Sequence, residues 1–231
     1  MPELPEVEVV KRSLKNKILN LIIKKVKIND DKLRFRVNKK ELLKVVGMRI
    51  KKIKRITKFL IFFFEQNYIM LAHLGMTGKF FFVNKNKKKY KTSFYYSINE
   101  EKDKKHDHVV FFFSKNRKLI YNDVRQFGFI KFFNIQNLNN NLHLNKLGPE
   151  PLEKNFNYNY FKKYIVGRSR TIKDILMDQK FLSGLGNIYT NEILFLSKIK
   201  PTRKVKKLKN FELKKLIKFT RNVLDSSIKY G

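Results

Sequence analysis

The first two residues of this 231-residue sequence can supply a nucleophile. A small residue such as Pro2 permits removal of Met1, and the terminus then carries a secondary amine. An α-amino group has a pKa of about 7.7–8, far below that of lysine, so part of it is neutral at physiological pH. Such an amine can attack a sugar C1′ and form an imine. Taken alone, Pro2 and Pro5 favour a simpler interpretation, which is the start of a helix.

Glu3 lies beside that amine. A carboxylic acid donates a proton only if it is kept protonated, and burial or a nearby carboxylate such as Glu6 would raise its pKa. The simpler explanation is that Glu3, Glu6 and Glu8 suit the positive end of a helix dipole.

Apolar residues spaced three or four apart predict a first helix from Pro5 to about Leu19. Short β-rich runs follow, and their number predicts a sandwich or barrel. They are Leu21–Ile28, Arg49–Ile56, Phe59–Phe64, Tyr68–His73, Lys79–Val83, Ser93–Ile98, His108–Ser114, Lys118–Asn122 and Gly128–Phe133. A helical insertion is expected at Lys39–Val46, and the charged stretches Lys85–Lys91 and Asn99–Lys105 are expected to be loops.

A second domain is predicted after an Asn-rich linker that ends in LGPEP. The pattern beyond it is helical, at Phe156–Val166, Thr171–Met177, Asn187–Leu196 and Asn210–Tyr230. We therefore expect an α+β protein with an N-terminal β-sandwich domain led by a helix (1–134), a linker (135–151) and a helical domain (152–231).

The charge of the chain points to a polyanionic partner. Lysine and arginine number 53 against 19 acidic residues, which gives a formal charge of +34. Nucleic acid is the first candidate, because so much like charge repels itself. Since 42 of the basic residues are lysine, an AT-rich genome could also contribute to this bias. No apolar run reaches the ~18 residues of a membrane span, so we expect a cytoplasmic, nucleoid-associated protein.

Six motifs in this order give a more specific indication. They are MPELPEVEVV, HLGMTGKF, KHDHV, DVRQFG, LGPEPL and LSGLGNIYTNE. Together they resemble bacterial formamidopyrimidine-DNA glycosylase along the whole chain. The resemblance implies a helix-two-turns-helix element in the second domain. It also implies a base-excision repair enzyme that acts on oxidised purines and then cleaves the strand by β,δ-elimination.

The resemblance also assigns catalytic roles. It implies that Pro2 is the nucleophile, that Glu3 protonates the deoxyribose ring oxygen, and that Lys58 assists elimination. With 42 lysines in the chain, Lys58 taken alone would be a solvated charge at a strand end.

Base removal from a duplex requires the nucleotide to be everted, and an inserted wedge can offset that cost. The resemblance implies that Met76, Arg125 and Phe127 form this wedge, with Arg125 facing the orphaned base. The alternative is that Met76 and Phe127 are core residues and Arg125 a surface charge. The family usually has DPRRFG, so Val124 and Gln126 depart from it.

Further residues match family positions that hold DNA phosphates, namely His106, Arg168, Lys173 and Asn187, with Arg170 close to Arg168. We expect Gly184 and Gly186 to let the backbone approach a phosphate, and the helix that starts near Asn187 to offer unpaired N–H groups. His106 and His108 are poor metal ligands, since no third ligand is evident.

The sequence has no cysteine and stops about forty residues before family members do. The family's structural zinc, held by a C-terminal four-cysteine finger, is therefore not expected here, and no other cofactor is implied. The expected partner is double-stranded DNA containing oxidised bases, bound by a monomer. Two alternatives remain open: the sister branch that acts on oxidised pyrimidines, and a truncated DNA-binding remnant with impaired catalysis.

Overall fold

The computed structural model describes residues 2–92 and 104–230, which divide into two compact units. The first unit contains Pro2 and residues 6–139, and the second contains residues 3–5 and 140–230. The chain passes from the first to the second unit between Asn139 and Asn140, within the range 135–151.

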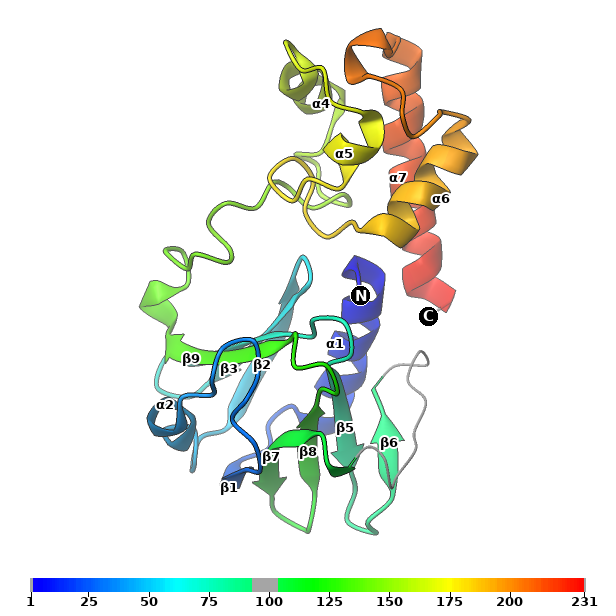
Figure 1. The fold of residues 1–231 in the computed structure, drawn as a ribbon. Coiled ribbons are helices and arrows are strands. Elements are labelled where there is room, and N and C mark those ends of the chain that lie inside the picture. The colour runs from blue at the N-terminus through cyan, green and yellow to red at the C-terminus, as the bar shows by residue number, and fades with distance from the viewer. Residues whose placement is uncertain (1, 93–103, 231) are drawn as a thin grey trace. The chain divides into compact units, whose positions relative to one another are not determined.

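The first unit consists of two antiparallel sheets with helix α1 (Leu4–Ile18), whose first residues belong to the second unit (Figure 1). One sheet has the strand order β1-β7-β8-β5-β6 and the other β2-β3-β4-β9. The strands are β1 (Ile23–Ile28), β2 (Ile50–Ile56), β3 (Phe59–Phe64), β4 (Tyr68–His73), β5 (Lys79–Val83), β6 (Lys89–Lys91), β7 (Asp107–Phe113), β8 (Lys118–Asn122) and β9 (Phe129–Asn134). The short helices α2 (Lys39–Leu43) and η1 (Ile135–Asn137) complete the unit.

Alternating apolar residues explain why the two sheets pack face to face. On β3, Leu60, Phe62 and Phe64 point into one core, because successive side chains of a strand face opposite sides. Phe62 contacts Phe80 of the other sheet, with ring centroids 5.6 Å apart. Helix α1 contributes to the same core a fully buried stripe: Val7, Val10, Leu14 and Ile18.

The second unit is helical and has a core of its own. Its helices are α4 (Tyr158–Ile165), α5 (Ile172–Leu176), α6 (Asn187–Ser197), η2 (Val205–Lys207) and α7 (Asn210–Tyr230). Polar caps define where the first two begin: the Asn157 side chain caps α4, and Thr171 and Asp174 form a capping box on α5. Phe161 and Phe181 pack together in the core, with ring centroids 4.9 Å apart.

The α+β fold, with a sandwich led by a helix and a helical unit after it, is confirmed. The prediction of a loop at Lys85–Lys91 is wrong in part, because Lys89–Lys91 pairs with β5 as the edge strand β6. Charged side chains are tolerated on an edge strand. Because two of the three residues of β6 are lysines, a search for alternating apolar residues did not identify the strand. The strand expected at Ser93–Ile98 and most of the loop Asn99–Lys105 lie outside the described residues.

Within the described ranges, every helix is too short or too polar to cross a bilayer.

Candidate active site

The described chain starts at Pro2, which is half-buried. Its neighbour Glu3 is only 2 % exposed and makes defined contacts within the second unit. The Glu3 carboxylate accepts hydrogen bonds from the backbone N–H groups of Gly186 (2.6 Å), Ile188 (2.9 Å) and Tyr189 (3.4 Å). The residue after the candidate nucleophile is therefore fixed at the N-terminus of α6.

This contact supplies α6 with the cap that its own sequence lacks. Gly186 occupies the N-cap position and has no side chain to accept an N–H. The first N–H groups of a helix need acceptors, and a carboxylate suits the positive end of its dipole. Leu4 adds a backbone bond, with its N–H donating to the carbonyl of Gly184 at 3.0 Å.

The two glycines before α6 make room for these N-terminal residues. A Cβ on Gly186 would lie 2.5 Å from Glu3 Oε1, and a Cβ on Gly184 would lie 2.8 Å from a methyl carbon of Leu4. Gly184 also has a φ of +99°, a conformation that favours glycine. The expectation that these N–H groups are unpaired is therefore wrong, because the N–H groups of Gly186, Ile188 and Tyr189 donate to Glu3.

Lys58 lies in the tight turn between β2 and β3 and is 7 % exposed, so it is not the solvated strand-end charge of the simpler interpretation. The preceding residue, Thr57, has a φ of 54°, which is rare for a β-branched residue. Arg55 supports the turn: its Nη1 donates to the Thr57 carbonyl at 3.0 Å, and its Nε donates to Glu8 of α1 at 3.0 Å.

Glu8 is the acceptor that ties this hairpin to α1. Its carboxylate also accepts from Lys11 Nζ (2.6 Å) and Arg12 Nε (3.0 Å). Burial raises the pKa of Glu8, but hydrogen bonds and the positive charges of Lys11 and Arg55 outweigh that effect, so the pKa lies below its ordinary value. Glu8 is therefore held as a carboxylate.

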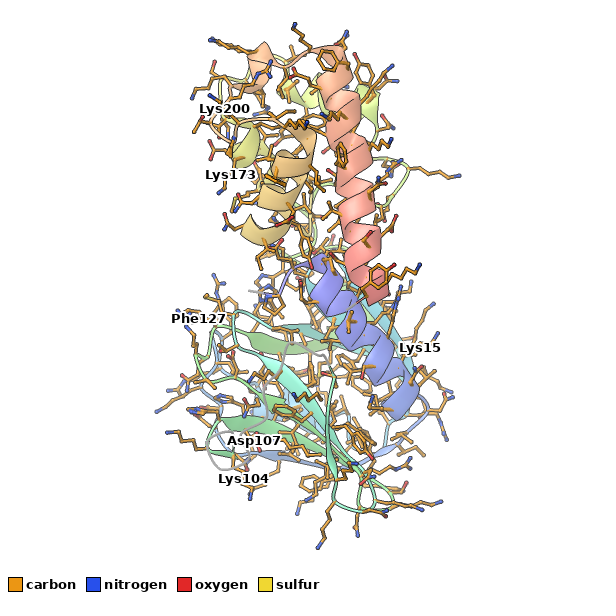
Figure 2. The ribbon with its side chains drawn as sticks, turned by 90° about the vertical axis from the view of Figure 1, so that its right-hand side faces the viewer. Lys15, Lys104, Asp107, Phe127, Lys173 and Lys200 are labelled. Carbon is orange, nitrogen blue, oxygen red and sulfur yellow. The ribbon has the colours of Figure 1, made fainter. Side chains whose placement is uncertain are left out.

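The three predicted wedge residues lie around one pocket of the first unit. Met76 and Phe127 are 43 % and 45 % exposed, so neither is a core residue. The Arg125 guanidinium lies 4.6 Å from the centre of the Phe127 ring. All three line a pocket of about 680 Å³, together with Leu33, Arg34, His73, Gly75 and Gln126. Figure 2 labels Phe127 at the margin of its unit.

Asp123 holds the loop that carries two of these residues, although Val124 replaces the proline usual in the family. One carboxylate oxygen of Asp123 accepts from Thr77 Oγ1 (2.5 Å), and the other accepts from the Gly128 N–H (2.7 Å). The Thr77 hydroxyl in turn accepts the Arg125 N–H at 3.0 Å. These bonds link the Met76 and Arg125 segments directly.

Of the predicted phosphate-binding residues, His106 lies in the first unit, and the others lie in the second unit. His106 immediately precedes β7, and its carbonyl accepts the Asp123 N–H at 3.1 Å. His108 is buried, with Nε2 2.9 Å from the Asp123 carbonyl oxygen and Nδ1 3.3 Å from that of Asp30, so it is a structural contact. Among the described residues, no group of three or more His, Cys, Asp or Glu could hold a metal.

In the second unit, Arg168 and Arg170 make different contacts: Arg170 pairs with a carboxylate, and Arg168 lies against an aromatic ring. Arg170 forms an ion pair with Asp178 at 2.6 Å. Arg168 is exposed, and its guanidinium lies 4.2 Å from the centre of the Tyr164 ring. Lys173 lies on α5, whose backbone contacts Pro201, and Figure 2 shows Lys173 and Lys200 on neighbouring segments. Asn187 is the exposed first residue of α6.

Sequence reasoning missed two parts of this arrangement. It gave no role to Leu33 and Arg34, which line the same pocket as the wedge residues. It also did not foresee that Glu3 caps α6, although a helix that starts after glycine without a capping side chain is a signal that a cap must come from elsewhere.

Comparisons with known proteins cover almost the entire chain. Residues 1–130 match the formamidopyrimidine-DNA glycosylase N-terminal domain, and residues 147–231 match the formamidopyrimidine-DNA glycosylase H2TH domain. A Rickettsia bellii protein named formamidopyrimidine-DNA glycosylase is 40 % identical over the whole chain and 79 % of its own length. A Rickettsia felis protein of the same name is 38 % identical over the whole chain and 78 % of its own length.

Solved structures agree with this similarity. The Lactococcus lactis Fpg in complex with abasic-site DNA has a TM-score of 0.85 and 29 % identity, over 99 % of this chain and 80 % of that one. The same enzyme in complex with DNA containing N7-benzyl-Fapy-dG has a TM-score of 0.84 and 29 % identity, over 99 % and 79 %.

Proposed function

Because the chain belongs to the formamidopyrimidine-DNA glycosylase family, we propose that it excises oxidised purines from duplex DNA and then cleaves the strand at the resulting site. It is a DNA repair glycosylase. The proposal concerns its substrates, 8-oxoguanine and formamidopyrimidines, its lyase step and the residues that carry out each step.

In the proposed mechanism, the Pro2 nitrogen attacks C1′ of an everted nucleotide, and the damaged base leaves with the electron pair of the glycosidic bond and takes up a proton from water. Glu3 takes the proton that the Pro2 nitrogen loses and passes it to the ring oxygen. The C1′–oxygen bond breaks, and the nitrogen lone pair forms the C=N bond of an imine in its charged, iminium form. The three backbone N–H groups that donate to Glu3 stabilise the carboxylate that remains after proton transfer. Lys58 then assists loss of the 3′ and the 5′ phosphate.

One observation supports this proposal most directly: Met76, Arg125 and Phe127 surround a single pocket and expose large apolar side chains beside a guanidinium. Phe195 and Phe211 are also exposed, but Met76 and Phe127 lie together at one pocket beside the Arg125 guanidinium, and this grouping suits a wedge that replaces a base in the stack. DNA phosphates would contact His106, Arg168, Lys173 and Asn187.

We further propose that the residues of this chain hold no metal and that the protein is a monomer. The residues present do not fit the four-cysteine zinc site of the family, because the sequence contains no cysteine. No step of the proposed mechanism needs a cation.

Borohydride trapping tests the mechanism. Protein with Met1 removed is incubated with an 8-oxoguanine duplex and reduced, and the adduct is located by peptide mass spectrometry. We expect one adduct, on the peptide that begins with Pro2. Protein that retains Met1 is the control and should give none, because its proline nitrogen is part of a peptide bond.

A Lys58→Gln variant separates the steps. It should still form the adduct on a preformed abasic site but release cleaved strands more slowly. No adduct from correctly processed protein would contradict the mechanism and favour a DNA-binding remnant. Preference for an oxidised pyrimidine would contradict the substrate assignment.

A further inference from the structure

The pocket that carries the wedge residues has a second wall. Leu33 and Arg34 line it, and they come from the loop 29–38 between β1 and α2. Nothing in the family motifs of this chain assigns these two residues a role. A side chain on this wall would face whatever the wedge residues face.

The loop is held in place from several directions. The Arg34 N–H donates to the Gly128 carbonyl at 3.1 Å, which joins it to the segment that carries Arg125 and Phe127. The His108 ring lies between two carbonyl oxygens, Asp30 at 3.3 Å and Asp123 at 2.9 Å, so it bridges the bases of both loops. Leu33 is buried beneath the loop. Ordering the Arg34 backbone on binding would therefore cost little conformational entropy.

Anchoring also involves the next residue, Phe35. Its ring packs edge-on against Phe129 of β9, with centroids 5.3 Å apart, and Lys131 Nζ lies 3.9 Å from its centre. Burial lowers the pKa of Lys131. Lys131 therefore belongs to the support of the loop, whereas Arg34 is exposed at its surface.

The charges around the pocket favour an anion. Its lining residues include two arginines and a histidine but no carboxylate. Within the described part of the chain, the Arg34 guanidinium forms no ion pair, whereas Arg36, two residues further on, lies 3.9 Å from Asp31. An exposed guanidinium without an acidic partner, on a rigid loop, is suited to bidentate binding of a phosphate.

We propose that Arg34 binds a backbone phosphate of the DNA beside the site where the wedge residues enter the stack. The inference rests on the proposed function, since it takes the pocket to face a duplex with an everted nucleotide. Arg34 and Arg125 would then hold the DNA from two segments that line one pocket, and Arg34 would add affinity without reading sequence.

The test compares Arg34→Gln with Arg36→Gln, a matched control in the same loop with the same change of charge. The probe is a duplex with a tetrahydrofuran abasic-site analogue, and affinity is measured from about 50 to 200 mM salt. We expect Arg34→Gln to lower the slope of log affinity against log salt by about 0.9, the value for one phosphate contact. Affinity should fall about tenfold, as for loss of one charge-assisted contact.

Arg36→Gln should leave the slope close to that of the unchanged protein. Arg34→Lys should restore the slope, because it keeps the charge, but not the full affinity. Equal changes in Arg34→Gln and Arg36→Gln, or no change in either, would overturn the inference. Thermal unfolding of each variant verifies that the protein is folded.

The borohydride experiment keeps the two proposals distinct. If the unchanged protein traps no imine while Arg34→Gln still lowers the salt slope, the mechanism fails and the DNA contact stands. If the imine forms and the slope is unaffected, only the role of Arg34 is refuted.

Discussion

Glu3 depends on backbone groups up to 186 positions away in the sequence. Its carboxylate caps α6 only because Gly186 has no side chain. A carboxylate held by several N–H groups cannot change its direction without losing them, and catalytic groups need such fixed geometry. Positioning of the proposed acid is therefore a property of α6 as much as of Glu3.

Gly186→Ala tests this dependence. The added Cβ would lie 2.5 Å from Glu3 Oε1, so the carboxylate must move. We expect the single-turnover excision rate to fall at least tenfold and the free energy of unfolding to fall by about 1–3 kcal/mol, because buried N–H groups lose their acceptor. Gly167→Ala is the control: its φ of +71° costs stability, but a Cβ there meets no atom within 4 Å. Unchanged excision in Gly186→Ala would refute the positioning role.

Phe127→Ala tests the wedge. Phe127 is 45 % exposed, so its removal should change the free energy of unfolding by about 0.5 kcal/mol or less. Affinity for the abasic-site duplex should fall, and fluorescence of a 2-aminopurine placed beside the lesion should report less unstacking. Val124→Ala is a matched control, being 43 % exposed in the same loop. If both variants bind alike, Phe127 does not enter the DNA.

Elements with a clear periodic pattern could be predicted from the sequence, and those held by distant contacts could not. The stripe from Val7 to Ile18 defined α1 to within a residue at each end. Edge strand β6 was missed because it has three residues, two of them lysines, and follows the lysine-rich segment 85–88, so Tyr90 alone gives no recognisable alternation. The second wall of the pocket was missed because a loop such as 29–38 has no period, and its place is set by bonds to Gly128 and His108.

The Glu8–Arg55 pair joins α1 to the hairpin that carries Lys58, and both side chains are 11 % exposed. The pKa of Glu8 is lowered from 4.5 in the folded protein. Its contribution to stability is therefore fully present above about pH 4.5 and is lost as the pH falls through the lower, folded-state pKa.

Glu8→Gln should consequently destabilise the protein by about 1–3 kcal/mol at pH 7. The loss should be smaller at pH 3, because the contribution of Glu8 declines as the pH falls from 4.5 through its lowered pKa. Urea unfolding at both pH values measures this difference. Glu192→Gln, an exposed change on α6, should shift neither value. An equal loss at pH 7 and pH 3 would mean that the charge on Glu8 does not contribute to the free energy of unfolding.

For the whole molecule, a formal charge of +34 predicted a polyanionic partner but could not say where the partner binds. The family motifs supplied candidate residues, and the fold placed three of them around one pocket. The two units have separate cores, so neither needs a metal to reach a size at which a core is stable.

The purified chain should therefore contain well below one zinc per molecule, and a chelator should leave its melting temperature and its excision rate unchanged. Elemental analysis and thermal unfolding with and without EDTA measure this. Stoichiometric zinc whose removal lowers the melting temperature would show that residues other than cysteine bind a structural metal.

The capping of α6 by Glu3 also sets an order of events during synthesis. Glu3 leaves the ribosome among the first residues. The N–H groups of Gly186 and Ile188, which donate to its carboxylate, follow more than 180 residues later. At about 5–20 residues per second, this delay lasts roughly ten to forty seconds. Until then the residues at the start of α1 lack their hydrogen bonds to the segment that begins α6. Helix α6, which emerges ahead of η2 and α7, then supplies the N–H groups that hold Glu3.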